Sequence, residues 1–351
     1  MTDEQFSERL LIQLRSSPEI VLDASSRIVI LSDLHMGDGS SNDDLRRNGK
    51  LIASVLELHY LAKGSTLVLN GDIEDLQKFS LAKIRSAWRG VFSLFDRFAH
   101  EGKLYKISGN HDDKLLEEAR YPYPLHPGLR LAWGKRTIYV FHGHQASGFL
   151  VKHNDLSGAF VRYLLHTLGI RNRSPAEDSL RRYRIERRIY AFSRGAGLVS
   201  IIGHTHRPLF ESLSKYDRLR FEIERLCAEY SGADEARRTA IAETVGLFKA
   251  EFRRMGRKEK RSGPSQGLYG SDLLLPCLFN SGRAVGKKGI TAIEIEAGRI
   301  GLAYWFEEGK ARRYLEREAG PAALLEGTPY RRILIGNEAL DNVFARMDLL
   351  S

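Results

Sequence analysis

Short apolar runs recur along the chain, and each ends at a glycine or a small polar residue. The clearest runs cover residues 27–32, 66–70, 104–108, 136–142 and 198–202. They are rich in Val, Ile and Leu and are bounded by turn-forming residues, a pattern that predicts buried strands. Between them, apolar residues that recur three and four positions apart predict helices.

The remaining segments extend this alternation of strands and helices. Helices are predicted over residues 3–16, 45–63, 78–100, 179–194 and, with mixed charge, 211–262. Further strands are predicted over 274–280, 289–296 and 300–306, and residues 130–133 predict a hairpin with 136–142. The pattern is consistent with an α/β protein whose strands carry the chemistry at their ends.

Side chains that can bind metal ions follow five of the strand-like runs. The stretches are Asp33-Leu34-His35, Gly71-Asp72, Gly109-Asn110-His111-Asp112, His142-Gly143-His144 and Gly203-His204-Thr205-His206. Any one of them could be an ordinary polar turn. Five in succession predict that these side chains meet at one edge of a sheet.

The chemistry of the set is coherent. The candidate ligands are Asp33, His35, Asp72, Asn110, His142, His204 and His206. Carboxylate and imidazole groups suit divalent ions such as Mn²⁺, Fe²⁺ or Zn²⁺, and the lack of a thiolate argues against a closed structural zinc site. Seven ligands suit two ions that share a carboxylate. Two ions about 3.5–4 Å apart activate water for an in-line displacement at phosphorus.

This ordered set resembles the calcineurin-like metallophosphoesterases. The family pattern of Asp-x-His, Gly-Asp-x-x-Asp, Gly-Asn-His-Asp, a single His before Gly, and Gly-His-x-His is matched completely and in order. The resemblance covers about residues 28–206 and resumes near Asn280-Ser281-Gly282. It does not cover two long inserts between the strand-like runs.

The resemblance implies a role for each matching residue. Asp33, His35 and His206 would hold one metal ion, whereas Asn110, His142 and His204 would hold the second, with Asp72 bridging the two. His111 would protonate the leaving oxygen or stabilise the transition state, and Asp75 would orient His111. The implied activity is hydrolysis of a phosphate ester or pyrophosphate by a hydroxide that bridges the two metals.

The resemblance also implies a fold, a four-layer α/β/β/α sandwich of two mixed sheets with helical inserts. We expect an N-terminal helix in residues 1–26 and the metallophosphoesterase domain in 27–310. The expected inserts are a helical cap over 149–198 and a charged helical segment over 209–268, and residues 311–351 form a C-terminal extension.

Charge is concentrated in the inserts. The 351 residues carry a net charge of +10. Residues 151–195 hold 10 Lys or Arg against 4 Asp or Glu, and residues 207–270 hold 14 against 10, so the rest is neutral. Such a surface attracts polyanions, namely phosphorylated metabolites, nucleic acid or an anionic membrane surface. The alternative is a solvated basic helix face.

The first insert is the expected source of substrate specificity. It combines clustered arginines with an apolar stripe from Phe160 to Leu168. We therefore predict a cap over the metal edge, with Arg184 and Arg188 as substrate contacts and His144 lining the site. In placement the cap is similar to that of UDP-2,3-diacylglucosamine pyrophosphatases. Those enzymes commonly carry Arg where this chain has His111, which favours a more general phosphoesterase.

Other classes of function are alternatives to this reading. A nuclease or nucleotide phosphodiesterase would also exploit a basic surface. A non-catalytic binding module that keeps the fold predicts a missing ligand or a missing His111, and none is missing. The composition, 42% hydrophobic and 28% charged, suits a soluble globular protein. With two cysteines, no secretory signal and no run of about 18 apolar residues, we expect a cytoplasmic protein without a transmembrane helix.

Overall fold

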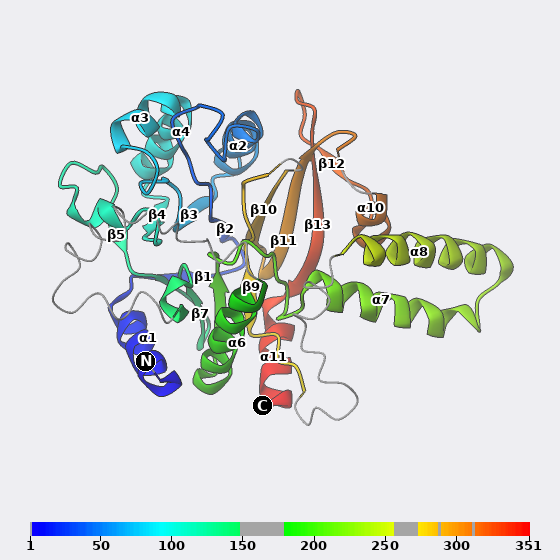
Figure 1. Ribbon diagram of the computed structural model, residues 1–351. Coiled ribbons are helices and arrows are strands. Elements are labelled where there is room, and N and C mark those ends of the chain that lie inside the picture. The colour runs from blue at the N-terminus through cyan, green and yellow to red at the C-terminus, as the bar shows by residue number, and fades with distance from the viewer. Residues whose placement is uncertain (1, 148–178, 256–272, 287–288, 311–312) are drawn as a thin grey trace.

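Two mixed β-sheets pack face to face, and helices cover their outer faces (Figure 1). The computed structural model describes residues 2–147, 179–255, 273–286, 289–310 and 313–351. The predicted apolar stripe from Phe160 to Leu168 lies outside these residues.

The larger sheet has eight strands in the order β12-β13-β11-β10-β2-β3-β4-β5. Neighbours from β2 to β5 are parallel, and the other pairs are antiparallel. The strands are β2 (Arg27–Leu31), β3 (Thr66–Asn70), β4 (Leu104–Ile107), β5 (Leu125–His126), β10 (Ile290–Glu296), β11 (Arg299–Glu307), β12 (Ala323–Leu324) and β13 (Tyr330–Ala339).

The smaller sheet has five strands in the order β1-β6-β7-β8-β9. Strands β6 and β7 form the predicted antiparallel hairpin, and β7, β8 and β9 run parallel. The strands are β1 (Glu19–Leu22), β6 (Leu129–Trp133), β7 (Arg136–Val140), β8 (Val199–Ile202) and β9 (Leu278–Asn280).

Alternation along each central strand builds two core layers. In β2, Ile28 and Ile30 face the smaller sheet and join the core between the sheets. Val29 and Leu31 face the opposite way and pack under helices. Because both faces of the strand are buried, the run reads as continuously apolar, which explains why it was recognisable in the sequence.

Helices complete the outer layers and confirm the predicted four-layer α/β/β/α sandwich. Helices α2 (Gly49–Val55), α3 (Leu81–Ala87) and α4 (Arg89–His100) lie on the larger sheet. Helices α1 (Asp3–Ser16) and α6 (Ser179–Ala196) lie on the smaller one, so helices predicted over 3–16 and 179–194 are confirmed.

The second insert forms a helical hairpin that extends away from the body of the molecule (Figure 1). Its helices are α7 (Lys215–Tyr230) and α8 (Glu235–Arg254). At the base, Leu219 and Phe248 pack with Ile333 of β13 and with α10 (Arg313–Ala319). The helical prediction over 211–262 is confirmed for these two helices, whereas residues 211–214 and 231–234 are not helical. Helix α11 (Leu340–Leu350) ends the chain.

Two predicted helices differ from the observed ones. The helix expected from residue 45 starts at Gly49 and ends in a π-helical turn, Leu56–Leu61. The Asp43 carboxylate accepts hydrogen bonds from the backbone N–H groups of Gly39 and Leu45. These bonds stabilise a turn before Gly49 instead of a helix. The helix expected over 78–100 begins at Leu81 and is interrupted at Trp88, whose indole N–H also donates to Asp43.

Strands β1 and β13 were not expected from the sequence, and β9 is shorter than the predicted run. Strand β1 pairs with β6, and β13 pairs with β11 inside the larger sheet. Residues from both ends of the chain therefore belong to the two central sheets. Of the helices in the described part of the chain, none combines the length and apolar character that a membrane span needs.

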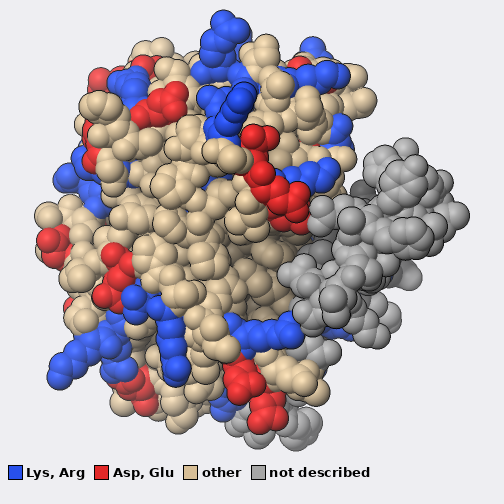
Figure 2. Space-filling model, turned by 90° about the vertical axis from the view of Figure 1, so that its left-hand side faces the viewer, with Lys and Arg blue, Asp and Glu red and all other residues tan. Residues whose placement is uncertain are grey.

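The basic side chains do not merge into one surface on the face that carries β5 and α1. Figure 2 shows Lys and Arg above and below a central area with few charged side chains, and Asp and Glu lie among them. On the described part of this face, positive and negative charges alternate. The net charge of +10 is therefore not gathered there into one continuous basic patch.

Candidate metal centre

Both sheets deliver polar side chains to one edge. Strand β2 leads into Asp33 and His35, β3 into Asp72, and β4 into Asn110. From the smaller sheet, β7 leads into His142, and β8 leads into His204 and His206. Because these strands carry the chain towards the same edge, six of the seven predicted ligands form two clusters, which Asp72 joins. Asn110 lies in the loop where the backbone N–H of the next residue, His111, donates to Asp72.

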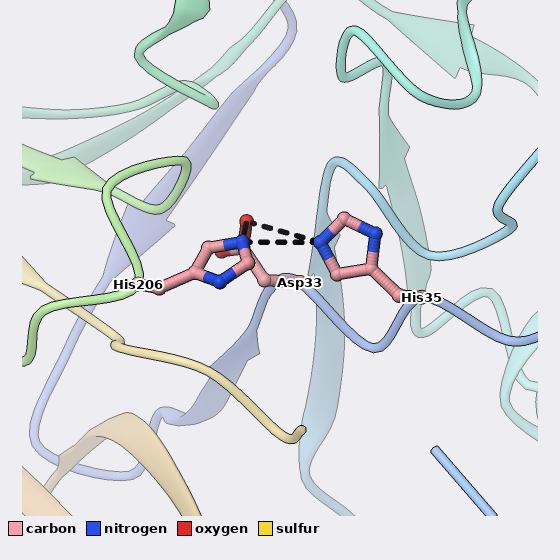
Figure 3. Close-up of side chains that lie close together, drawn as sticks. All are labelled: Asp33, His35 and His206. Carbon is pink, nitrogen blue, oxygen red and sulfur yellow. Dashed lines mark hydrogen bonds and ion pairs between the residues drawn. The ribbon is translucent and has the colours of Figure 1, made fainter. Parts of the chain in front are cut away.

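The first cluster consists of Asp33, His35 and His206, whose ligand atoms lie within 4.8 Å of one another. The two rings point towards each other beside the carboxylate (Figure 3), with 3.1 Å between their Nε2 atoms. His206 Nε2 lies 3.1 Å from Asp33 Oδ1. Burial and the neighbouring His206 lower the pKa of His35 to about 4, so this ring is neutral at pH 7 and can act as a ligand.

The second cluster consists of Asp72, His142 and His204, also within 4.8 Å of one another. His142 donates from Nδ1 to the carbonyl of Asn70 at 2.8 Å, which leaves Nε2 facing Asp72 at 3.2 Å. Burial opposes a charged ring, but the Asp72 carboxylate outweighs it and raises the pKa of His142 to about 9. A divalent cation would take the place of that proton.

The donor atoms fit a pair of cations. Asp72 Oδ2 lies 4.0 Å from His35 Nε2, so this carboxylate faces both clusters. Asn110 Oδ1 and His204 Nε2 are buried and have no hydrogen-bond partner among the described residues. Buried polar atoms are normally paired, and an unpaired one costs about 1–3 kcal/mol. An oxygen and a nitrogen of this kind, buried in the loops that carry the candidate ligands, fit the chemistry of a metal site.

The backbone is strained at most of the candidate ligands. Asp33, His35, Asp72, His204 and His206 all have φ between 47° and 63°, in the left-handed region. Residues other than glycine rarely adopt it, and each costs about 1–3 kcal/mol, so such strain gathers at functional sites. This conformation turns each side chain from its strand towards the common edge.

Two glycines permit the close approach of the loops. A Cβ at Gly109 would lie 2.3 Å from the backbone nitrogen of Asp72. Gly71 has a φ of +77°, and a Cβ there would lie 2.5 Å from the ring of His142. A larger residue at either position would push a ligand away, which is the physical reason for glycine before these motifs.

His111 and Asp75 form a pair at the rim of the clusters. His111 Nδ1 lies 3.0 Å from Asp75 Oδ1, and the backbone N–H of His111 donates to Asp72 at 2.8 Å. The ring packs edge-on against His35. Burial lowers the pKa of His111, but the charge of Asp72 and the hydrogen bond to Asp75 outweigh it and raise the pKa above its ordinary value. Lys78 pairs with the second oxygen of Asp75 at 2.9 Å.

A buried ion-pair network lies beneath these loops and was not predicted. Lys106, fully buried in β4, contacts Glu74 at 2.7 Å and Asp112 at 2.6 Å. The Asp112 carboxylate also accepts hydrogen bonds from the backbone N–H groups of Ile73 and Gly109. One carboxylate thus joins the loop of Asp72 to the loop of Asn110. The sequence signal that could have indicated this network was Lys106, a lysine inside a run that was predicted to be a buried strand.

The three residues expected to contact substrate occupy different environments. His144 lies beside the second cluster, with its ring 5.5 Å from that of His142, and burial lowers its pKa to about 4. Arg184 is exposed. Arg188 pairs with Asp3 at 2.8 Å and lies over the ring of Phe6 at 4.6 Å, so it joins α6 to α1.

Comparison with known proteins identifies the class that this fold and site define. The family model described as "Calcineurin-like phosphoesterase superfamily domain" matches residues 27–250. The chain therefore belongs to the calcineurin-like phosphoesterase superfamily. The match includes all seven candidate ligands together with His111 and Asp75. No curated protein matches the chain significantly.

Solved structures with related folds include a phosphoesterase from E. coli, Yfce, at 12% identity and a TM-score of 0.36, which covers 90% of this chain and 99% of that one. Another is Vacuolar Protein Sorting 29 from Cryptosporidium parvum, at 10% identity and a TM-score of 0.31, covering 82% and 95%. Because these scores lie below 0.5, membership in the family rests on the sequence match.

Proposed function

We propose that the protein is a metal-dependent hydrolase that uses two divalent cations to cleave a phosphate ester. The observation that carries the proposal is Asp72, a buried carboxylate that faces His142 at 3.2 Å on one side and His35 at 4.0 Å on the other. A single anion between two sets of ligands is the arrangement that two cations require.

Each ligand has an assigned cation in this proposal. Asp33, His35 and His206 hold the first, and His142, His204 and Asn110 hold the second, with Asp72 shared. The otherwise unpaired Oδ1 of Asn110 and Nε2 of His204 support this assignment. When bound, the two ions supply an activated water and a clamp for the phosphate oxygens. A mixed oxygen and nitrogen set suits Mn²⁺, Fe²⁺ or Zn²⁺.

His111 acts on the leaving group. Its Nδ1 is held by Asp75, so Nε2 is the atom available to a substrate at the rim. The raised pKa favours the protonated form of the ring, which is the form that a general acid requires. The proton on Nε2 passes to the departing oxygen, and Asp75 stabilises the orientation of the ring throughout.

The test is hydrolysis of bis-p-nitrophenyl phosphate and of p-nitrophenyl phosphate by protein loaded with Mn²⁺, with Asp72→Asn as the control. We expect metal-dependent release of p-nitrophenolate by the wild type and its loss in the variant. Inactivity of the loaded wild type towards both esters and towards a panel of natural phosphate compounds would contradict the proposal and favour a binding module.

The natural substrate is a phosphorylated anion whose class a panel would identify. Nucleotide sugars, cyclic nucleotides, phosphoproteins and single-stranded nucleic acid are the informative members. The segment predicted to form a pyrophosphatase-like cap, residues 149–198, falls mostly outside the described ranges, so cleavage of UDP-2,3-diacylglucosamine stays a prediction. The retained His111 supports a broader phosphoesterase.

A further inference from the structure

Helix α6 carries one acidic residue among six arginines. In Ser179–Ala196 the acidic residue is Glu186, and it is buried with 3% of its surface exposed. A carboxylate is seldom buried unless it is paired. The helix itself is anchored on the smaller sheet by the buried side chains of Ile185, Ile189 and Phe192.

The partners of Glu186 lie in the loop that carries two candidate ligands. Thr205, between His204 and His206, donates from Oγ1 to Glu186 Oε1 at 2.7 Å. Arg207 follows the second histidine and donates from Nε to the same oxygen at 3.1 Å, while its Nη2 contacts Oε2. One carboxylate of the insert therefore holds both the middle and the end of the loop.

The loop needs such support because its backbone is strained. His204 and His206 have φ values of 63° and 56°, in the left-handed region. The hydroxyl of Thr205 also accepts a hydrogen bond from Asn280 at 2.9 Å, so it is fixed from two sides. Glu186 in addition offsets the charge of Arg207, which would otherwise lie next to a site for cations.

We propose that Glu186 is a positioning residue that sets the affinity of the metal centre by holding the loop His204–His206 in its ligating conformation. The insert thereby acts on the metals and not only on the substrate. The inference rests on the proposed function, because it requires that both histidines bind metal. Since one histidine serves each cation, both affinities depend on Glu186.

The experiment measures Mn²⁺ affinity by isothermal titration calorimetry on the full chain, alongside thermal unfolding of the metal-free protein. Glu186→Ala removes every contact, and Thr205→Val removes only the hydroxyl. We expect the dissociation constants of both ions to rise about 10- to 100-fold in each variant, the range for loss of a group that orients a ligand. Glu186→Gln keeps an acceptor for Thr205, so it should restore part of the affinity. Arg187→Ala, an exposed neighbour on α6, is the matched control and should bind Mn²⁺ as the wild type does.

The outcomes separate the two proposals. Wild-type affinity for Mn²⁺ in folded Glu186→Ala and Thr205→Val, even with a lowered melting temperature, would overturn the role of Glu186 and leave the metal centre intact. A wild-type protein that binds no Mn²⁺ would overturn the metal centre itself. If Glu186→Ala does not fold, the Mn²⁺ affinities of Thr205→Val and Glu186→Gln test the role of Glu186, because each of these variants keeps a side chain of similar size.

Discussion

The Nδ1 atom of His111 lies 3.0 Å from Oδ1 of Asp75, three residues beyond Asp72, whose carboxylate faces both clusters. The pair joins two loops that follow neighbouring parallel strands, β3 and β4. This contact fixes which ring nitrogen faces the metal edge. In the proposed mechanism, it therefore governs whether His111 can deliver a proton.

Replacing His111 with Ala should lower kcat by about 10²–10⁴ for an ester with a poor leaving group, because the departing oxygen loses its proton donor. The effect on p-nitrophenyl esters should be smaller, since p-nitrophenolate leaves without a proton. Steady-state kinetics on matched alkyl and p-nitrophenyl esters checks this, with metal content as the control. Equal losses on both esters would assign His111 to electrostatic stabilisation.

Asp75→Asn should move the basic limb of the pH–rate profile to lower pH. Burial lowers the pKa of His111, and Asp72 and Asp75 together raise it above its ordinary value. The protonated form is present below that pKa and is lost as pH rises through it. Removing the charge of Asp75 lowers the pKa, so the active form is lost earlier. An unchanged basic limb would show that another group controls it.

Asp72→Asn should reduce occupancy of both metal positions, because the amide is a weaker ligand than the carboxylate that faces both clusters. Elemental analysis after reconstitution with Mn²⁺ measures this directly. Asp23→Asn, at an exposed turn, is the control and should retain the wild-type metal content. Two tightly held ions in Asp72→Asn would remove this residue from the bridging position.

Lys106→Met should destabilise the fold by about 3–5 kcal/mol, since it leaves two buried carboxylates without their cation. Burial, followed by the charge of Asp112, raises the pKa of Glu74 despite the opposing effect of Lys106, so loss of the lysine should raise it further. Lys103→Met, just before the same strand and with 38% of its side chain exposed, should cost about 0.5 kcal/mol or less. Urea unfolding of both variants gives the comparison, and similar losses would contradict a specific role for the network.

Arg184→Ala and Arg188→Ala should act differently although both lie on α6. Arg188 joins this helix to Asp3 and Phe6, so its loss should lower stability by about 1–2 kcal/mol. Arg184 is exposed, and its loss should leave stability unchanged. If Arg184 contacts substrate, KM for large anionic esters should rise with kcat unchanged. An unchanged KM would remove it from the substrate site.

The candidate metal centre was predictable because its information is local. Each ligand follows a buried strand and a small residue, so Asp33 and His204 are marked within a few positions. The order of the motifs then identified the family. The central strands were recognisable for the same reason, since both of their faces are buried.

Other features depend on partners far away in the sequence. Strand β1 has only one buried residue, Leu22, and is defined by its pairing with β6 more than 100 residues later. Strand β13 alternates weakly because much of it is half-buried. The sequence pattern predicted Arg188 as a substrate contact on a basic helix and did not single out Glu186. In the structure, α6 packs against the loop of Thr205 and against α1. Glu186 contacts Thr205, and Arg188 contacts Asp3, so the two residues have different roles that the helix pattern did not indicate.

The division of the candidate ligands between the two sheets has a thermodynamic consequence. Asp33, Asp72 and Asn110 follow strands of the larger sheet, whereas His142 and His204 follow strands of the smaller one. A pair of ions held here would tie the two layers of the sandwich together, as a cross-link does. By mass action, each ion at 100 times its dissociation constant would add about 2.7 kcal/mol to the free energy of unfolding. Chelation would then loosen the whole sandwich as well as stop turnover, so metal supply would govern how long the protein survives proteolysis.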